Sequence, residues 1–146
     1  MTLPEFPQYD AKVAAGLEGP AAAAGGLAAF LAIEHVEVGP GSLHARLAVR
    51  DDLLTPFRNL HGGVLAALCD HVLGTVLYPV IPRGAWAATT EFKINYLAAV
   101  TTGDLDARAS IISITKRTAV VRIDVENAGQ LVCAAQGTVL VVAPKA

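Results

Sequence analysis

The stretch that decides the fold is GGVLAALCDHVLGTVLY, residues 62–78. It is apolar at nearly every position, and a helix that is apolar on all sides is expected to be buried on all sides. Pro79 and Pro82 end the helix because proline lacks the backbone N–H that a continuing helix needs. The pattern therefore predicts one long central helix, covered by other elements over most of its surface.

Short segments of strand character flank this helix on both sides. Before it, IEHVEV (33–38) and SLHARLAV (42–49) alternate apolar and polar residues across the turn GPG, which predicts a β-hairpin. After it come four segments rich in Val, Ile and Thr: AWAATTEFKINYL (85–97), DLDARASIISI (104–114), RTAVVRIDVEN (117–127) and LVCAAQGTVLVV (131–142). Turn residues separate these four, so we expect them to form an antiparallel meander.

Together these elements predict one α+β domain. An antiparallel sheet of about six strands, wrapped around the single long helix, would cover most of that helix. We expect the domain to span residues 27–146 and to begin with a short helix at about 27–31. Residues 1–26 are expected to form an irregular N-terminal leader, with at most one turn of helix.

Composition excludes several classes of protein. With 53% hydrophobic and 16% charged residues the chain can build a core, and its net charge of −2 without a basic cluster argues against nucleic acid. Asp70, His71 and Pro79 interrupt the apolar runs before the about 18 residues that a membrane span needs, and no signal peptide is recognisable at the N-terminus. Cys69 and Cys133 lie in apolar segments, so we expect buried thiols in a reducing, cytoplasmic compartment.

Asp70 is the anomaly of the apolar helix. Burying an unpaired carboxylate costs several kcal/mol, and no Lys or Arg lies within four residues of it. A structural aspartate with a buried hydrogen-bond donor and a general base in a cleft both fit this position. Gly63, Ala66, Ala67 and Gly74 share its face at three- and four-residue steps, so a ligand, a strand or a second chain is expected to pack closely there.

The helix begins after NLHGG, residues 59–63. The first N–H groups of a helix lack an internal partner and carry partial positive charge, and Gly62 and Gly63 do not shield them. A polarised carbonyl oxygen could approach these amides, as in an oxyanion hole, although the same residues also occur at ordinary helix starts.

Four segments of the chain carry a resemblance to a known family: HGGVLAALCD (61–70), TTEFKINYL (89–97), TKRTAVV (115–121) and GQLVCAAQGT (129–138). They resemble the hotdog-fold acyl-CoA thioesterases of the phenylacetate-pathway type, within the 4-hydroxybenzoyl-CoA thioesterase superfamily. That family has an acidic residue nine positions after its His-Gly-Gly histidine, as His61 and Asp70 are spaced, and a Ser or Thr seven positions before an aromatic residue, as Thr89 and Tyr96 are. The resemblance covers about residues 27–142 and implies a hotdog fold that hydrolyses an acyl-CoA.

The resemblance also implies catalytic roles. Gly62 would donate its backbone N–H to the thioester oxygen, and Asp70 would act as general base or nucleophile. Thr89 would orient the carboxylate or the attacking water, and His61 would fix the start of the helix near the thioester.

Other residues are candidates for contacts with the substrate. The family often has Asn or Gln where this chain has Thr55, whereas Asn59 lies nearby and is either a donor to the substrate or a helix cap. Gly63 adds a second unshielded amide. Lys116 and Arg117, at a turn between strands, are the best candidates to bind the CoA phosphates, although ordinary solvated charges also occur at turns. The histidines show no metal-ligand spacing, so we expect no metal and no cofactor besides the CoA of the substrate.

The spacing of Gly62 and Asp70 predicts a dimer. Eight residues of helix span about 12 Å, but a reacting carbon must lie about 3 Å from both a base and an oxyanion donor. Antiparallel helices around a two-fold axis would place Gly62 of one chain beside Asp70 of the other. We therefore expect an obligate homodimer, which could pair into a tetramer, with neither membrane nor nucleic acid as a partner.

Three functions are compatible with the sequence. Thioester hydrolysis is favoured, and its acyl group, whether aryl or medium-chain, stays open. A non-catalytic acyl-CoA-binding or sensing module would use the same groove without needing the carboxylate. A hotdog dehydratase acting on a hydroxyacyl thioester usually pairs a histidine with an acid around one carbon, in a motif that this chain does not show.

Overall fold

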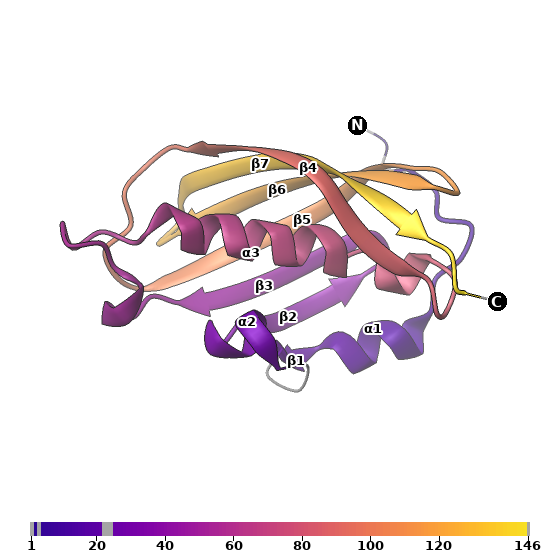
Figure 1. Cartoon of the computed structure of the whole chain (residues 1–146), viewed down its shortest axis with the longest axis horizontal. Helices are drawn as coiled ribbons and strands as arrows, with labels where there is room; N and C mark the ends of the chain where they lie inside the picture. Colours follow the sequence, from indigo (N-terminus) through magenta and orange to yellow (C-terminus); the bar gives the residue numbers. More distant parts are fainter. Residues whose placement is uncertain (1, 3, 22–24, 146) are drawn as a thin grey trace.

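One long helix lies in the hollow of a curved antiparallel sheet (Figure 1). The structure is a computed structural model that describes residues 2, 4–21 and 25–145. Its helices and strands are, in chain order, α1 (Ala11–Leu17), β1 (Gly19–Pro20), α2 (Gly26–Phe30), β2 (Glu34–Gly39), β3 (Ser42–Ala48), α3 (Gly62–Thr75), β4 (Trp86–Tyr96), β5 (Asp104–Ile114), β6 (Thr118–Asn127) and β7 (Gln130–Val142). Short 3-10 turns, η2 (Asp51–Leu53) and η3 (Tyr78–Val80), lie on either side of α3. This is the predicted α+β arrangement.

The strand order is β1-β2-β3-β5-β6-β7-β4, and every pair is antiparallel. The predicted hairpin is confirmed as β2 and β3. The predicted four-strand meander is wrong in one respect, because β4 pairs with β7 at the edge of the sheet and β5 pairs with β3. The reason is that α3 carries the chain across the concave face to the far edge, which leaves the place beside β3 for β5.

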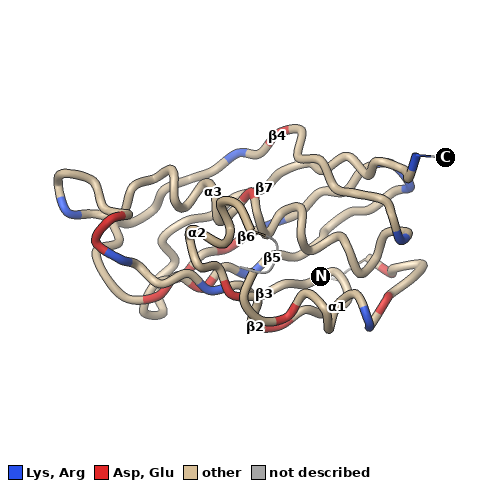
Figure 2. Tube along the Cα trace, turned by 60° about the horizontal axis from the view of Figure 1, so that its bottom comes forward, with Lys and Arg blue, Asp and Glu red and all other residues tan. Residues whose placement is uncertain are grey.

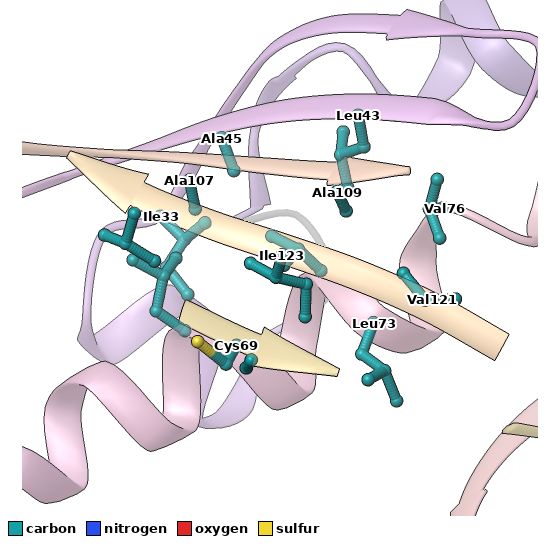
Figure 3. Packing of buried hydrophobic residues seen from close by; sticks show 14 of the residues in the cluster. Ile33, Leu43, Ala45, Cys69, Leu73, Val76, Ala107, Ala109, Val121 and Ile123 are labelled. Carbon is teal, nitrogen blue, oxygen red and sulfur yellow. The ribbon is translucent and has the colours of Figure 1, made fainter. Parts of the chain in front are cut away.

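The core lies between α3 and the concave face of the sheet. Cys69 and Leu73 of α3 and Val76 at its C-cap lie close to Val121 and Ile123 of β6, and all five are fully buried (Figure 3). Burying an aliphatic side chain of this size stabilises the fold by about 1.5–3 kcal/mol. The two cysteines are buried and free as predicted.

Close packing of α3 on the sheet depends on one glycine of β7. A Cβ atom on Gly137 would lie 2.7 Å from Leu73 Cδ1 and 2.6 Å from the carbonyl oxygen of Glu91. No side chain fits there without moving the helix or β4.

Within the described chain, α3 is buried on one side only, which contradicts the expectation of a helix covered all round. Leu68 and Val72 face the sheet and are fully buried, whereas Gly63 and Asp70 are exposed and Ala66 is half-buried. Gly and Ala raise the apolar count of the segment, but their small surface does not require cover. The small residues and Asp70 form the open face of α3, defined here as Gly63, Ala66, Ala67, Asp70 and Gly74.

By length and composition alone, the segment Gly62–Val80 could cross a membrane, contrary to the expectation that Asp70, His71 and Pro79 interrupt such a run. Half of the segment is buried within the chain, and a buried core helix meets the same criteria.

The N-terminal residues are more ordered than the predicted irregular leader. Asp10 caps α1 by accepting hydrogen bonds from the N–H groups of Lys12 and Val13, both at 3.1 Å. Its own N–H donates to Pro79 O at 2.7 Å, which ties α1 to the turn after α3. The strand β1 pairs with β2, and α2 is the short helix predicted at about 27–31.

Candidate active site

Asp70 lies at the rim of a small cavity on the open face of α3. Its carboxylate is exposed, and within the described chain it has no hydrogen bond or ion pair. The cavity has a volume of about 210 Å³ and an otherwise largely apolar wall, and it is also lined by His71. The apolar lining residues come from α2, the connection between α2 and β2, and α3: Leu27, Ala28, Leu31, Ile33 and Ala67. Asp70 is therefore a solvent-accessible carboxylate beside a hollow, and not the buried one that the sequence pattern predicts.

His71, which lines the same cavity, is paired with a second histidine, His35, behind it. His35 Nδ1 lies 2.6 Å from the carbonyl oxygen of Leu17, and His35 Nε2 lies 2.8 Å from His71 Nε2. The two rings stack with their centroids 5.1 Å apart. Burial, reinforced by the nearby His35, lowers the pKa of His71 to about 4, while Asp70 acts in the opposite direction. The pair has no signal in the sequence because its members lie on different elements, 36 positions apart.

His61 caps α3 with its own side chain. Its Nδ1 accepts a hydrogen bond from Gly63 N–H at 2.8 Å, so the alternative that Asn59 caps the helix is wrong. The capping bond occupies the Gly63 amide, which the sequence predicted as a second free donor. The Gly62 N–H has no acceptor among the described residues, which makes it the available donor at the start of α3.

Tyr96 covers Gly62 from the end of β4. Its hydroxyl donates to Gly62 O at 3.0 Å, and a Cβ atom on Gly62 would lie 3.2 Å from the ring. Both residues line a cavity of about 330 Å³ together with Asn59, Leu65 and Leu97. Burial raises the pKa of Tyr96, so its hydroxyl stays a donor at neutral pH. In the sequence, Tyr96 fits the aromatic position of the family pattern, but it was not among the residues predicted for the active site.

The loop before α3 holds Asn59 in a fixed orientation. Thr55 N–H donates to Asn59 O at 2.7 Å, and the Thr55 hydroxyl donates to Asn59 Oδ1 at 2.8 Å. The same hydroxyl oxygen accepts Phe57 N–H at 3.2 Å. With its oxygen engaged, the Asn59 side chain offers its NH₂ group as a donor.

The remaining predicted residues lie apart from these groups within the described chain. Thr89 is exposed on β4, with no hydrogen bond to Asp70 in the part of the structure that is described. Lys116 and Arg117 form the turn between β5 and β6, and Lys116 lines a cavity with Val80 beyond the C-terminal end of α3. Cationic residues are spread over the molecule rather than gathered in one patch (Figure 2).

The outer edge of the sheet lies beside the open face of α3. The edge strand β4 has eleven residues, and its aromatic residues Trp86 and Tyr96 are 52% and 53% exposed. A Cβ on Gly74 would lie 3.8 Å from Ala87 Cβ, so the open face and this edge adjoin.

Comparison with known proteins identifies the family. The thioesterase superfamily model matches residues 57–134, which hold the start of α3, Asp70 and Thr89. This chain belongs to the thioesterase superfamily. It is accordingly a thioester hydrolase, and a relative of this class is the 1,4-dihydroxy-2-naphthoyl-CoA hydrolase of Listeria monocytogenes, 31% identical over 80% of this chain and 95% of that protein.

Solved structures of the thioesterase superfamily share the fold. A thioesterase from Haemophilus influenzae aligns with a TM-score of 0.77 at 26% identity, over 81% of this chain and 83% of that one. The PaaI protein of the E. coli phenylacetic acid degradation operon aligns with a TM-score of 0.75, over 81% of this chain and 85% of that one. At 22% identity the second likeness concerns the fold alone. The hotdog thioesterase fold predicted from the sequence is confirmed.

Proposed function

We propose that this thioester hydrolase acts on an acyl-CoA, in an active site shared between two copies of the chain. The observation that carries the proposal is the placement of an accessible carboxylate and a free helix amide on one helix. Asp70 and the Gly62 N–H are eight residues apart, which is about 12 Å. Because a thioester carbon must lie about 3 Å from both a base and an oxyanion donor, one chain cannot supply both to one substrate.

Two copies related by a two-fold axis would supply both groups. If their α3 helices lie antiparallel, Gly62 of one chain faces the partner subunit's Asp70, and the axis passes near Ala66, halfway between them. The small side chains of the open face allow this close approach. The eleven-residue strand β4 supports the same assembly, because its outer edge has no partner strand among the described residues. Pairing β4 with its copy would continue the sheet and cover the exposed backbone.

The chemistry follows from these groups. As a general base, Asp70 takes a proton from water, whose oxygen attacks the thioester carbonyl carbon. The Gly62 N–H stabilises the resulting oxyanion, the C–S bond breaks, and CoA leaves as a thiolate that takes up a proton. As a nucleophile, Asp70 attacks the carbon itself, the C–S bond breaks and CoA leaves as a thiolate that takes up a proton. Water then hydrolyses the mixed anhydride to the free acid and regenerates the Asp70 carboxylate.

The other site residues have supporting roles in this proposal. The Asn59 amide, oriented by Thr55, is a second donor to the oxyanion, and Thr89 orients the attacking water. Antiparallel α3 helices would bring the partner subunit's Lys116 and Arg117 to the end of the molecule that holds Gly62, where they would bind the CoA phosphates. His61 and Gly63 maintain the start of the helix through their capping bond.

The test is a panel of aryl and medium-chain acyl-CoAs, followed by release of free thiol. We expect hydrolysis that Asp70→Ala abolishes and that Asp104→Ala, at an exposed aspartate on β5, leaves unchanged. Tight binding without turnover would support a binding module instead, and a change in unsaturation would support a dehydratase. An active protein that sediments as a monomer would contradict the shared site.

One experiment separates the two catalytic routes. In a single turnover in heavy-oxygen water, label that enters Asp70 supports the anhydride. Label found only in the released acid supports the general base.

A further inference from the structure

The cavity beside Asp70 has a wall that lies outside the matched family region. The family match begins at residue 57, whereas Leu27, Ala28 and Leu31 come from the preceding α2 segment. Leu31 and Ile33 are 3% and 1% exposed and form its apolar floor. Because Asp70 stands at the rim, a thioester carbon near this carboxylate would have the cavity immediately beside it.

Hydrogen bonds fix which nitrogen of His71 carries its proton. A carbonyl oxygen can only accept, so His35 Nδ1 donates to Leu17 O. In the neutral pair, His35 Nε2 is then the acceptor, and His71 Nε2 must donate to it. The remaining nitrogen of His71, Nδ1, is left as an acceptor.

This acceptor can be reached from outside the protein. No hydrogen bond to His71 Nδ1 is present within the described chain, and no buried side-chain nitrogen or oxygen there lacks a partner. Since His71 Nδ1 has no partner and is not a buried atom without one, it must be accessible to solvent. His71 lines the cavity, so a bound molecule can reach this nitrogen. Since the pKa of His71 is lowered to about 4, the ring is neutral at pH 7 and Nδ1 keeps its lone pair.

We propose that this cavity holds the acyl group of the substrate and that His71 selects compact acyl groups that carry a hydrogen-bond donor. The inference rests on the proposed function and adds the substrate class. An apolar cavity of about 150 Å³ is known to hold a benzene ring, so the 210 Å³ here has room for about one small ring or a short branched chain. A hydroxyl or amide N–H on that group would meet the His71 acceptor within an otherwise apolar wall.

The selection is expected to be strong. A site whose polar group is fixed in advance rejects an analogue that leaves that group unpaired, because the desolvated acceptor has lost water without gaining a partner. His35 does not line the cavity and acts as a positioning residue, because it holds His71 in the accepting tautomer.

The first test compares acyl-CoAs of nearly equal size with and without a hydroxyl group. Benzoyl-CoA is compared with the hydroxybenzoyl-CoAs, and butanoyl-CoA with the hydroxybutanoyl-CoAs. We expect the wild-type chain to favour one hydroxylated member at least about tenfold in kcat/KM. His71→Leu and His35→Leu should reduce this ratio to near one, and His71→Gln, which keeps an acceptor, should retain part of it. His44→Leu, on the outer face of the sheet, should leave the ratio unchanged.

A second test does not depend on whether the histidine variants fold correctly. Ala28 lines the cavity and its neighbour Ala29 does not, and both are half-buried on α2. Ala28→Phe should lower kcat/KM for ring-sized acyl groups about tenfold more than for acetyl-CoA, and Ala29→Phe should not discriminate.

The outcomes separate the two proposals. Failure of the wild-type chain to hydrolyse any acyl-CoA would refute the proposed function. Hydrolysis that depends on Asp70, with no hydroxyl preference or with equal effects of the two alanine variants, would overturn the cavity assignment alone.

Discussion

At the scale of single residues, the proposed mechanism depends on Asp70. Replacing it with Asn keeps its size but removes the charge and the ability to take a proton. We expect Asp70→Asn to lower kcat for an accepted acyl-CoA by about 10²–10⁴-fold, the usual contribution of a general base, with an unchanged unfolding midpoint because the side chain is exposed. Thiol release and chemical denaturation measure the two quantities, and a loss of stability matching the loss of activity would contradict the assignment.

His71 makes folding stability depend on pH. Its pKa is about 4 in the folded chain against 6.5 for the free side chain, so between these values the unfolded chain binds more protons. The contribution of His71 is complete above about pH 6.5 and is lost as pH falls toward 4. We expect the urea midpoint of His71→Gln to fall less than that of the wild type between pH 7 and pH 5. Equal slopes for the two proteins would show that the ring titrates normally.

At the scale of residues, the sequence indicates which side chains are candidates for the site better than it indicates how exposed they are and what they contact. Asp70, His61 and Gly62 were identified because a carboxylate inside an apolar helix and a His-Gly-Gly start are local features. The exposure of Asp70 was not predictable, because glycine and alanine look apolar whether or not anything covers them. The bond between His35 and His71 joins residues 36 positions apart and leaves no local pattern.

At the scale of elements, the fit of α3 on the sheet depends on Gly137. Gly137→Ala would place a methyl group within 2.7 Å of Leu73 and 2.6 Å of the Glu91 backbone, so we expect a loss of about 1–3 kcal/mol in urea unfolding. The matched control is Gly16→Ala in α1, where nothing lies within 4 Å of the new Cβ and the helix should gain about 0.5–1 kcal/mol. If both variants were equally stable, α3 would not be closely packed there.

Most elements were predictable from periodicity, but not how they pair. Alternation gave β2, β3 and the later strands, because side-chain direction is a local property. The place of β4 at the edge depends on contacts with β7, more than thirty residues later, which alternation does not encode. The helix α1 does have a local signal in the sequence, since Asp10 is a favourable N-cap and Gly19, with a φ of 99°, follows its end.

At the scale of the whole molecule, a shared site predicts that two inactive chains can restore each other. Gly62→Pro removes the donor N–H at the first helix position, where proline is compatible with the backbone once the Tyr96 ring, 3.2 Å from the new Cβ, shifts by a few tenths of an ångström. Asp70→Ala removes the carboxylate. Each variant alone should be inactive. When the two are refolded together in equal amounts, half of the dimers are mixed and each has one complete site, so about a quarter of the wild-type activity should return. A mixture as inactive as its components, although mixed dimers form, would contradict the two-fold arrangement.

The position of β4 has a consequence for how the protein is made. This strand leaves the ribosome well before β7, its neighbour in the sheet, has been synthesised. Until the last thirteen-residue strand emerges, both edges of β4 are open, and its apolar residues are free to join strands of other nascent chains. Newly made protein is therefore most prone to aggregate before β7 is available, and a stop codon at the start of β7, which removes every partner of β4, should yield insoluble protein.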